Sequence, residues 1–390
     1  VINTCSVTEN ANKECRRIIR KAKKISPQSN VIITGCYAQL KPESISNIEG
    51  VDMVVGANEK FNIPKLLKNF SNKTTEIHGC SINNLNYFSS FSLQDRTRSF
   101  LKVQDGCDYP CTYCTIPLAR GKSRSDNIQN IVKNAKEIAK NGIKEIVLTG
   151  VNIGDFKENN QRFIDLIREL EKVQGIERYR ISSIEPNLIT DEIIEFVKRS
   201  NKFMPHFHIP LQSGSDNILR LMKRRYNTGL YFEKIKKIKQ EIPNVCLGAD
   251  VIVGFPGEDD NEFNKTLNFI KDLGISYLHV FSYSERENTK AILMDNKVPK
   301  NKISERSKML RILSNKLQRK FYLNYQETEQ SVLFEQDNKD GFMHGFTKNY
   351  IKVKVPFDKS FVKTNSKVLL NTMDDTLIMN AKIKELCTQL

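Results

Sequence analysis

Short apolar runs alternate with amphipathic stretches in the first part of the chain. The predicted strands span residues 1–5, 31–35 and 52–55, and a helical pattern covers residues 10–25. Strands that are apolar at successive positions, with helices between them, are typical of a parallel sheet covered on both faces. Cys5 and Cys36 follow two successive strands, at the edge where open α/β sheets bind ligands.

Strand and helix patterns alternate strictly in the middle of the chain. Six strands are predicted at residues 100–104, 145–148, 179–182, 206–210, 246–253 and 277–281, with helical patterns between them, for example at 128–140, 161–171 and 260–273. This alternation predicts a barrel or partial barrel of parallel strands, with its chemistry at the carboxyl ends of the strands. Polar and glycine-rich segments follow most of these strands, so we expect one large site on that rim.

The pattern changes to short strands after a basic helical segment at residues 300–320. Strands are predicted at residues 331–335, 341–347, 351–356, 367–371 and 376–384. Five strands in so short a segment predict a small closed barrel, as in oligonucleotide-binding folds. Phe346, Lys348, Tyr350, Lys352 and Lys354 interleave aromatic and basic side chains. They form either an RNA-binding face or a set of core aromatics with solvated lysines between them.

The predicted fold class is therefore α/β in three domains. A parallel-sheet domain covers residues 1–90, a central partial (β/α)6 barrel covers residues 91–325, and a small β-barrel covers residues 326–390.

Charge narrows the choice of partner. The 390 residues carry a formal net charge of +16, which favours a polyanion such as nucleic acid. The alternative explanation of the charge is a biased genome composition that enriches lysine throughout the chain. Basic residues are concentrated at 13–24 and 300–320, which favours contact with a phosphate backbone. No apolar stretch approaches the roughly 20 residues of a membrane helix, so no membrane partner is expected. Nine cysteines are too sparse for a disulfide scaffold and indicate a reducing, cytoplasmic location.

Three cysteines carry the strongest chemical signal. Cys107, Cys111 and Cys114 stand at C-x3-C-x2-C spacing, with Tyr113 before the third. Three close thiolates can hold three irons of a 4Fe–4S cluster and leave the fourth iron open for a ligand. Zinc is the alternative metal, but no fourth Cys or His follows at zinc-finger spacing.

With these motifs in place, the whole chain resembles the radical S-adenosylmethionine (SAM) methylthiotransferases. These enzymes combine an N-terminal methylthiotransferase domain, a radical-SAM domain and a C-terminal TRAM domain. The residues that carry the resemblance are 3–8, 34–38 and 106–121. Residues 3–11 and 103–107 are most similar to the branch that acts on N6-threonylcarbamoyladenosine in tRNA. Sister branches act on isopentenyladenosine in tRNA and on an aspartate of a ribosomal protein.

The resemblance implies two 4Fe–4S clusters and SAM as cofactors. Cys107, Cys111 and Cys114 would hold the cluster that binds and cleaves SAM. Cys5 and Cys36 match two of the three ligands of an auxiliary cluster. The chain begins Val-Ile-Asn-Thr-Cys without Met. We therefore expect a fragment, in which the first of the three cysteine ligands of the auxiliary cluster lies upstream of residue 1. The residues expected to contact SAM are Tyr113, Gly150, Ser183, Glu185, Gln212 and Asp250. Cys15, Cys80, Cys246 and Cys387 are expected to be incidental.

The activity implied by the resemblance is conversion of N6-threonylcarbamoyladenosine at tRNA position 37 to its 2-methylthio derivative. The expected partners are a tRNA anticodon loop and an electron donor such as flavodoxin or ferredoxin. A catalytically inactive RNA-binding iron–sulfur protein is the alternative from another functional class.

Overall fold

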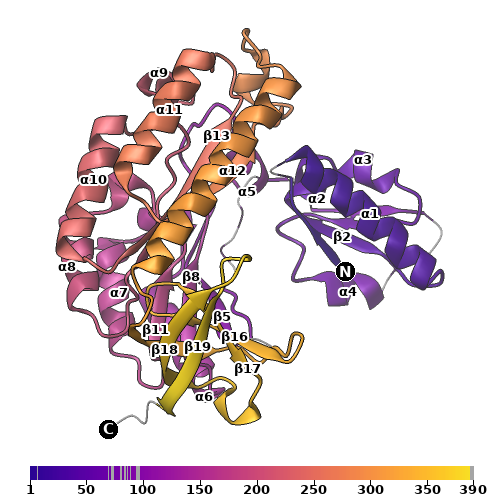
Figure 1. Ribbon diagram of the computed structural model, residues 1–390. Helices are drawn as coiled ribbons and strands as arrows, with labels where there is room; N and C mark the ends of the chain where they lie inside the picture. Colours follow the sequence, from indigo (N-terminus) through magenta and orange to yellow (C-terminus); the bar gives the residue numbers. More distant parts are fainter. Residues whose placement is uncertain are drawn as a thin grey trace.

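The protein is described by a computed structural model that covers residues 1–386 apart from residues 7, 69, 72, 73, 80, 83, 84, 86, 88 and 94–96. Figure 1 shows an N-terminal α/β part in indigo, a central barrel in magenta to orange, and a small yellow barrel beneath the central one. Cys80 and Cys387, both expected to be incidental, lie outside the described residues.

The N-terminal part is a four-stranded parallel sheet in the order β1-β2-β3-β4. Its strands are β1 (Ile2–Thr4), β2 (Ile32–Gly35), β3 (Met53–Val55) and β4 (Glu76–His78), and its helices are α1 (Glu9–Ile25), α2 (Cys36–Leu40), α3 (Pro42–Ser46) and α4 (Ile63–Lys68). Thr8 caps α1 by accepting a hydrogen bond from the amide of Ala11, and the helix buries Ile19 against Ile33 and Tyr37. The predicted parallel sheet is confirmed.

The central part contains six parallel strands with helices outside them (Figure 1). The strands are β5 (Arg98–Lys102), β8 (Glu145–Thr149), β11 (Arg178–Ile181), β12 (His206–His208), β13 (Cys246–Val253) and β14 (Tyr277–Ser282). They pair as β5-β8-β11 and β12-β13-β14, and a parallel bridge between Tyr179 and Phe203 joins the two halves. The predicted partial barrel is confirmed.

Seven helices described by the structure accompany these strands: α6 (Ile128–Lys140), α7 (Phe163–Glu171), α8 (Asp191–Arg199), α9 (Asp216–Leu221), α10 (Thr228–Glu241), α11 (Asp260–Leu273) and α12 (Lys300–Leu323). Smaller elements are α5 (Ile116–Arg120), the strand pair β6 (Gln104–Asp105) and β7 (Arg124–Ser125), the hairpin β9 (Lys157–Glu158) and β10 (Gln161–Arg162), and 3-10 helices at Ile153–Asp155, Pro186–Leu188, Lys290–Leu293 and Lys359–Phe361. The helix predicted to start at residue 161 thus starts two residues later, because Gln161 and Arg162 pair with β9.

The C-terminal part is a closed five-stranded barrel, as predicted. Its strands are β15 (Glu329–Phe334), β16 (Phe342–Thr347), β17 (Lys352–Pro356), β18 (Asn365–Met373) and β19 (Met379–Leu386), in the closed order β15-β16-β17-β19-β18. Val332, Phe334, Met343, Val353 and Leu370 fill its core.

Buried charges attach this small barrel to the central one. Arg178 donates to the backbone carbonyl of Phe346 at 2.8 Å, and Arg180 donates to the carbonyls of Thr347 and Lys348 at 2.8 and 3.1 Å. Glu145, which is 1% exposed, pairs with Arg180 at 3.1 Å. Arg178 and Arg180 thus hold backbone carbonyls of the small barrel, and Arg98 adds an ion pair with the Glu335 side chain at 2.7 Å.

The two aromatic side chains expected on an RNA face or in the barrel core lie in this interface instead. Phe346 and Tyr350 stack with ring centroids 4.8 Å apart. The guanidinium of Arg98 lies 4.7 Å from the Phe346 ring centroid, and that of Arg180 lies 4.9 Å from the Tyr350 ring centroid.

Among the helices that the structure describes, none combines the length and the apolar character needed to cross a membrane.

Candidate active site

The three cysteines of the central motif lie in the loop between β6 and α5. Gly106 begins the loop with a positive φ of 71°, and a Cβ at this position would lie 2.0 Å from the carbonyl oxygen of Lys122. Only glycine fits here. Thr112 anchors the loop through a hydrogen bond from its hydroxyl to the carbonyl of Leu221 (2.9 Å) and by accepting one from the amide of Ala291 (2.9 Å).

Each thiol of the loop has a nitrogen donor close to it. The amide of Tyr109 lies 3.4 Å from Sγ of Cys107, and the amide of Ile116 lies 3.4 Å from Sγ of Cys114. Nη1 of Arg224 lies 3.1 Å from Sγ of Cys111. Such donors stabilise thiolate sulfur, as in iron–sulfur sites.

Burial acts against ionisation of the same thiols when no metal is bound. It raises the pKa of the Cys107 thiol to about 11 and that of Cys114 to about 12, and mutual repulsion among the three thiolates adds to the effect. Three thiols close enough to repel one another, each with a nitrogen donor, are a donor set that suits a metal cluster.

Arg224 is the charged group closest to this thiol set. Its side chain is 3% exposed and forms an ion pair with Glu185, while Nε donates to the hydroxyl of Tyr226 at 3.2 Å. Glu185 was expected to contact SAM, and the structure places it as the carboxylate that neutralises Arg224 beside Cys111. Its contact with SAM stays a prediction. The basic pair Arg224–Arg225 in the sequence was the available signal for this position, but its spacing alone did not indicate a role.

A cavity of about 230 Å³ lies against the cysteine loop. It is lined by Thr8, Tyr113–Ile116, Gln212, Asp250, Ile252 and Phe281–Ser284. The structure thus brings together Tyr113, Gln212 and Asp250 of the six residues expected to contact SAM. Tyr113 packs edge-on against Phe255, with ring centroids 6.3 Å apart.

Gly150 and Ser183 do not line this cavity. Gly150 follows β8, where an added Cβ would be 3.0 Å from the carbonyl oxygen of Gln104, and Ser183 follows β11. Both stand at carboxyl ends of barrel strands, and their contacts with SAM stay predictions.

Asp250 also belongs to a polar cluster inside the barrel that sequence reasoning missed. Nε2 of His208 lies 2.8 Å from Oδ1 of Asp250, and Nδ1 of His279 lies 3.4 Å from the same oxygen. Burial alone would raise the pKa of Asp250, but hydrogen bonds from the two imidazoles lower it to about 2. The ligand atoms of the three residues lie within 4.8 Å of one another, a set that also suits a divalent metal. The alternating polar residues of β12, β13 and β14 were the available signal.

Cys5 and Cys36 lie at one edge of the N-terminal sheet, as expected. β1 and β2 are parallel neighbours with Thr4 opposite Gly35, so the two cysteines follow adjacent strand ends. Gly35 has a φ of 99°, and a Cβ there would lie 2.3 Å from the carbonyl oxygen of Thr4. Cys15 is buried in the core, with its thiol 3.9 Å from the carbonyl of Cys5.

Arg120 connects this edge to the central cysteine loop. It ends α5, the helix that follows Cys114, and its Nε lies 3.4 Å from Sγ of Cys36. Its guanidinium also pairs with Asp105 at 2.9 Å, and Arg124 and Lys102 pair with the same carboxylate at 3.1 and 3.6 Å. The helix that follows the central cysteines therefore contacts Cys36 directly through Arg120.

Comparisons with known proteins agree with this geometry. The radical SAM superfamily model matches residues 101–270, and the model of the uncharacterized protein family UPF0004 matches residues 1–56. The threonylcarbamoyladenosine tRNA methylthiotransferase MtaB of Bacillus subtilis is 39% identical over 364 residues, which is 90% of this chain and 81% of that protein. MtaB of Rickettsia prowazekii is 40% identical over 367 residues, which is 91% of this chain and 84% of that protein.

A tRNA-2-methylthio-N(6)-dimethylallyladenosine synthase of Thermodesulfovibrio yellowstonii is less similar, at 31% identity over 92% of this chain and 84% of its own. Among solved structures, the radical SAM methyltransferase TsrM of Kitasatospora setae matches with a TM-score of 0.54 and 12% identity, covering 72% of this chain and 61% of its own. That likeness concerns the fold alone. Identity of this extent across nearly the whole chain establishes that the protein belongs to the radical SAM methylthiotransferases, a family of enzymes that use 4Fe–4S clusters and SAM.

Proposed function

We propose that this protein converts N6-threonylcarbamoyladenosine at tRNA position 37 to its 2-methylthio derivative. The observation that carries the proposal is the meeting of three features in one place. The loop with three donor-supported thiols lines a cavity together with strand-end polar residues, and Arg120 of the helix after this loop contacts Cys36 at the edge of the N-terminal sheet. The choice of nucleoside is supported by 35–40% identity to five MtaB proteins, against 31–32% to dimethylallyladenosine synthases.

The residues present fit the cofactors that this chemistry needs. Cys107, Cys111 and Cys114 would hold the SAM-cleaving cluster, and Cys5 and Cys36 would contribute to an auxiliary one. When bound, the clusters and SAM would supply three things: a radical that removes the hydrogen from C2, a sulfur atom, and a methyl group for that sulfur. An aromatic C–H bond that is not otherwise activated requires such a cofactor, while the protein positions the substrate and excludes water.

The chain's own side chains have separable tasks in this proposal. Tyr113 packs beside the SAM site, Gln212 and Asp250 present polar groups to it, and Arg224 fixes the charge state around Cys111. Ser183 and the backbone of Gly150 are proposed as further contacts on the same rim.

A second groove supports RNA as the partner. It has a volume of about 940 Å³ and shares Thr8 and Phe281–Ser284 with the cavity beside the cysteine loop. Lys13 from α1, together with Lys300 and Arg311 from α12, lines it. Basic side chains along a groove that opens into the site suit the phosphates on either side of a base splayed out of a single-stranded loop.

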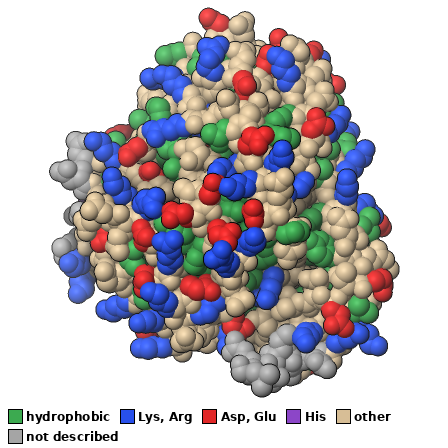
Figure 2. Space-filling model, turned by 90° about the vertical axis from the view of Figure 1, so that its left-hand side faces the viewer, with side chains coloured by type: hydrophobic (Ala, Val, Ile, Leu, Met, Phe, Trp, Pro, Cys, Tyr) green, Lys and Arg blue, Asp and Glu red, His purple; other side chains and the backbone are tan. Residues whose placement is uncertain are grey.

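Glu9 and Glu285 also line the groove, but its lining contains more basic than acidic residues, whereas the outer helical face is mixed. Figure 2 shows acidic and basic side chains intermingled over the outer helical face. Ion pairs there include Lys198–Glu241 at 2.8 Å and Lys237–Asp191 at 2.7 Å. Basic side chains on that face are thus balanced by acidic neighbours, so that face contributes little to the net charge of +16, which favours the groove as the RNA contact.

The proposal also includes the domain limits, the electron donor and the cellular location. Domain limits at residues 90 and 325 separate the sheet, the central barrel and the TRAM barrel. An electron donor such as flavodoxin or ferredoxin reduces the SAM-cleaving cluster. Seven described cysteines are free thiols, which suits the reducing cytoplasm.

The test uses anaerobically reconstituted protein with SAM, a reductant and anticodon stem-loops that carry either threonylcarbamoyladenosine or isopentenyladenosine. Mass spectrometry of the nucleosides should detect a methylthio group on the first substrate, and Cys107→Ser should abolish it together with the part of the reduced-state paramagnetic signal that shifts when SAM is added. Product formed only on the second substrate would contradict the choice of nucleoside. Failure to cleave SAM, with a cluster present, would contradict the enzymatic proposal.

A further inference from the structure

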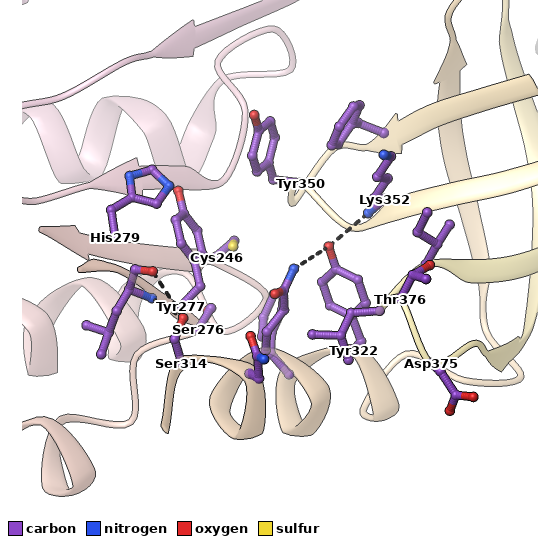
Figure 3. A pocket seen from close by; sticks show the side chains of 17 residues that line it. Cys246, Ser276, Tyr277, His279, Ser314, Tyr322, Tyr350, Lys352, Asp375 and Thr376 are labelled. Carbon is purple, nitrogen blue, oxygen red and sulfur yellow. Dashed lines mark hydrogen bonds between the residues drawn. The ribbon is translucent and has the colours of Figure 1, made fainter. Parts of the chain in front are cut away.

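A groove of about 580 Å³ lies where the edge strand β14, helix α12 and the small barrel meet, and it is called the β14–α12 groove below. Figure 3 shows the side chains that line it, which come from all three elements. Its lining includes Tyr277 and His279 of β14, Gln318 and Tyr322 of α12, and Phe346, Tyr350 and Lys352 of the small barrel. Cavities of roughly 300–1,000 Å³ are the usual size for small-molecule sites.

The groove begins one side chain away from the proposed SAM cavity. His279 lines the groove, and its Nδ1 lies 3.4 Å from Oδ1 of Asp250, which lines the cavity. In adenine, C2 and C6 both flank N1, so a base with C2 directed at the cavity has its N6 substituent on the adjoining side. A base turned with N6 toward His279 then directs this substituent into the groove.

The aromatic walls of the groove are held in place before any ligand binds. The hydroxyl of Tyr277 forms hydrogen bonds with His206 at 3.0 Å and His208 at 3.2 Å. Tyr350 lies between Phe346 and His206, with ring centroids at 4.8 and 4.5 Å. Fixed walls lower the entropic cost of binding a planar group such as a urea.

Lys352 is the cation that this groove leaves free. The hydroxyl of Tyr322 accepts the backbone amide of Lys352 at 3.1 Å and the side-chain amide of Gln318 at 3.2 Å. Within the described part of the chain, Nζ of Lys352 has neither a hydrogen bond nor an ion pair, in contrast to Lys354, which pairs with Asp374 at 2.5 Å. In Figure 3 the Lys352 side chain extends away from Asp375, the acidic residue of the lining.

We propose that the β14–α12 groove binds the threonylcarbamoyl group of the substrate, with its carboxylate paired to Lys352 and its urea against Tyr277 and Tyr350. This inference rests on the proposed function and adds the residues that select the nucleoside. An isopentenyl group has no charge to pair with Lys352, and a site built for a polar substituent discriminates against an analogue that lacks it.

The test compares the binding of two anticodon stem-loops of identical sequence, one with threonylcarbamoyladenosine and one with unmodified adenosine at position 37. The variants are Lys352→Ala, Lys352→Arg and the control Lys348→Ala, whose side chain lies on the same small barrel but lines a different groove. The wild type should prefer the modified loop. Lys352→Ala should weaken binding of that loop about tenfold, the value expected for one charge-assisted contact, and should leave the unmodified loop unaffected.

Lys352→Arg should keep the preference, and Lys348→Ala should act equally on both loops. Equal losses for both loops in Lys352→Ala would mean that Lys352 contacts phosphate, and would overturn the inference, as would a wild type with no preference. Methylthiolation by the wild type is measured in parallel, so that failure of the proposed function can be distinguished from failure of the inference about the groove. If it proceeds while Lys352→Ala shows no selective loss, the inference fails and the proposed function stands. If the wild type methylthiolates no tRNA but Lys352→Ala still weakens binding of the modified loop alone, the proposed function fails and the groove still binds the threonylcarbamoyl group.

Discussion

Replacing Glu145 by Gln tests whether the small barrel is held to the central one by buried charge. Glu145 is 1% exposed and lies 3.1 Å from Arg180 and 3.6 Å from Arg98. Arg178 and Arg180, which donate to carbonyls of the small barrel, are 1% and 2% exposed. The substitution keeps the shape of the side chain but leaves buried guanidinium groups without their shared carboxylate.

The expected cost is large because the partners stay behind in a buried site. Removing one member of a buried ion pair costs about 3–5 kcal/mol. The sign of the pH dependence follows from the pKa of Glu145. Burial alone would raise it, but Arg180, Arg98 and Arg178 lower it below the ordinary value. The stabilisation by Glu145 is therefore present above the unfolded pKa of about 4.3 and is lost as the pH falls through the folded-state pKa.

Urea unfolding can measure this effect at the small barrel itself. The chain has no Trp, so Phe357→Trp, at a position that is 37% exposed beside β17, provides a local fluorescence signal. Glu192→Gln is a matched control, because Glu192 also lies near two arginines, at 3.2 and 3.7 Å, but is 48% exposed. It should cost less than about 1 kcal/mol.

Equal shifts of the unfolding midpoint for Glu145→Gln and Glu192→Gln at pH 7 would refute the reasoning. A loss for Glu145→Gln that stays constant as the pH falls through the acid range would refute the assigned pKa direction.

Three further outcomes are expected. Arg224→Gln should lower the reduction potential of the cluster held beside Cys111, since the substitution removes a charged donor to sulfur; a redox titration followed by paramagnetic resonance checks this, and an unchanged potential would contradict it. Gly106→Ala should prevent assembly of that cluster, because its Cβ would overlap a backbone carbonyl; normal iron content would contradict the strain argument. Charge reversal at Lys13 and Arg311 should weaken tRNA binding and reduce its salt slope by about 1 for each phosphate that is no longer neutralised, so an unchanged slope would exclude the groove.

Strands with apolar runs could be predicted from the sequence, whereas the edge strand β4 and the two-residue strands β7, β9 and β10 could not. The six strands of the central barrel and the five of the small barrel follow apolar or alternating patterns and lie close to the predicted ranges. β4 was missed because Glu76, Ile77 and His78 form a short edge strand whose side chains are half-buried or exposed. Such a strand needs no apolar run, since its pairing is through the backbone.

The cysteine motifs could be recognised in the sequence from their spacing, but the groups that surround them in the fold could not. The N-terminal and central cysteines stand in local motifs, so their neighbours in sequence indicate them. Arg224 reaches Cys111 across more than 100 residues of sequence, and Arg120 reaches Cys36 across 84. Both contacts arise from folding, which leaves no periodic signal in one sequence.

The interface aromatics illustrate a different limit. Alternation correctly placed Phe346 and Lys352 on strands of a small barrel, but it cannot say which face meets another part of the same chain. Arg98 lies against the Phe346 ring and Arg180 against the Tyr350 ring, so these two aromatics of the pattern take part in a contact between barrels that alternation does not reveal.

The way the small barrel is held has a consequence for how such enzymes diverge. Arg178 and Arg180 grip the carbonyl oxygens of Phe346, Thr347 and Lys348, and every amino acid has a carbonyl. Substitutions at these three residues therefore leave the backbone hydrogen bonds in place, while a change at Phe346 also alters the lining of the β14–α12 groove. Single substitutions in the groove can therefore change the substrate preference of such an enzyme while these hydrogen bonds between its two barrels remain.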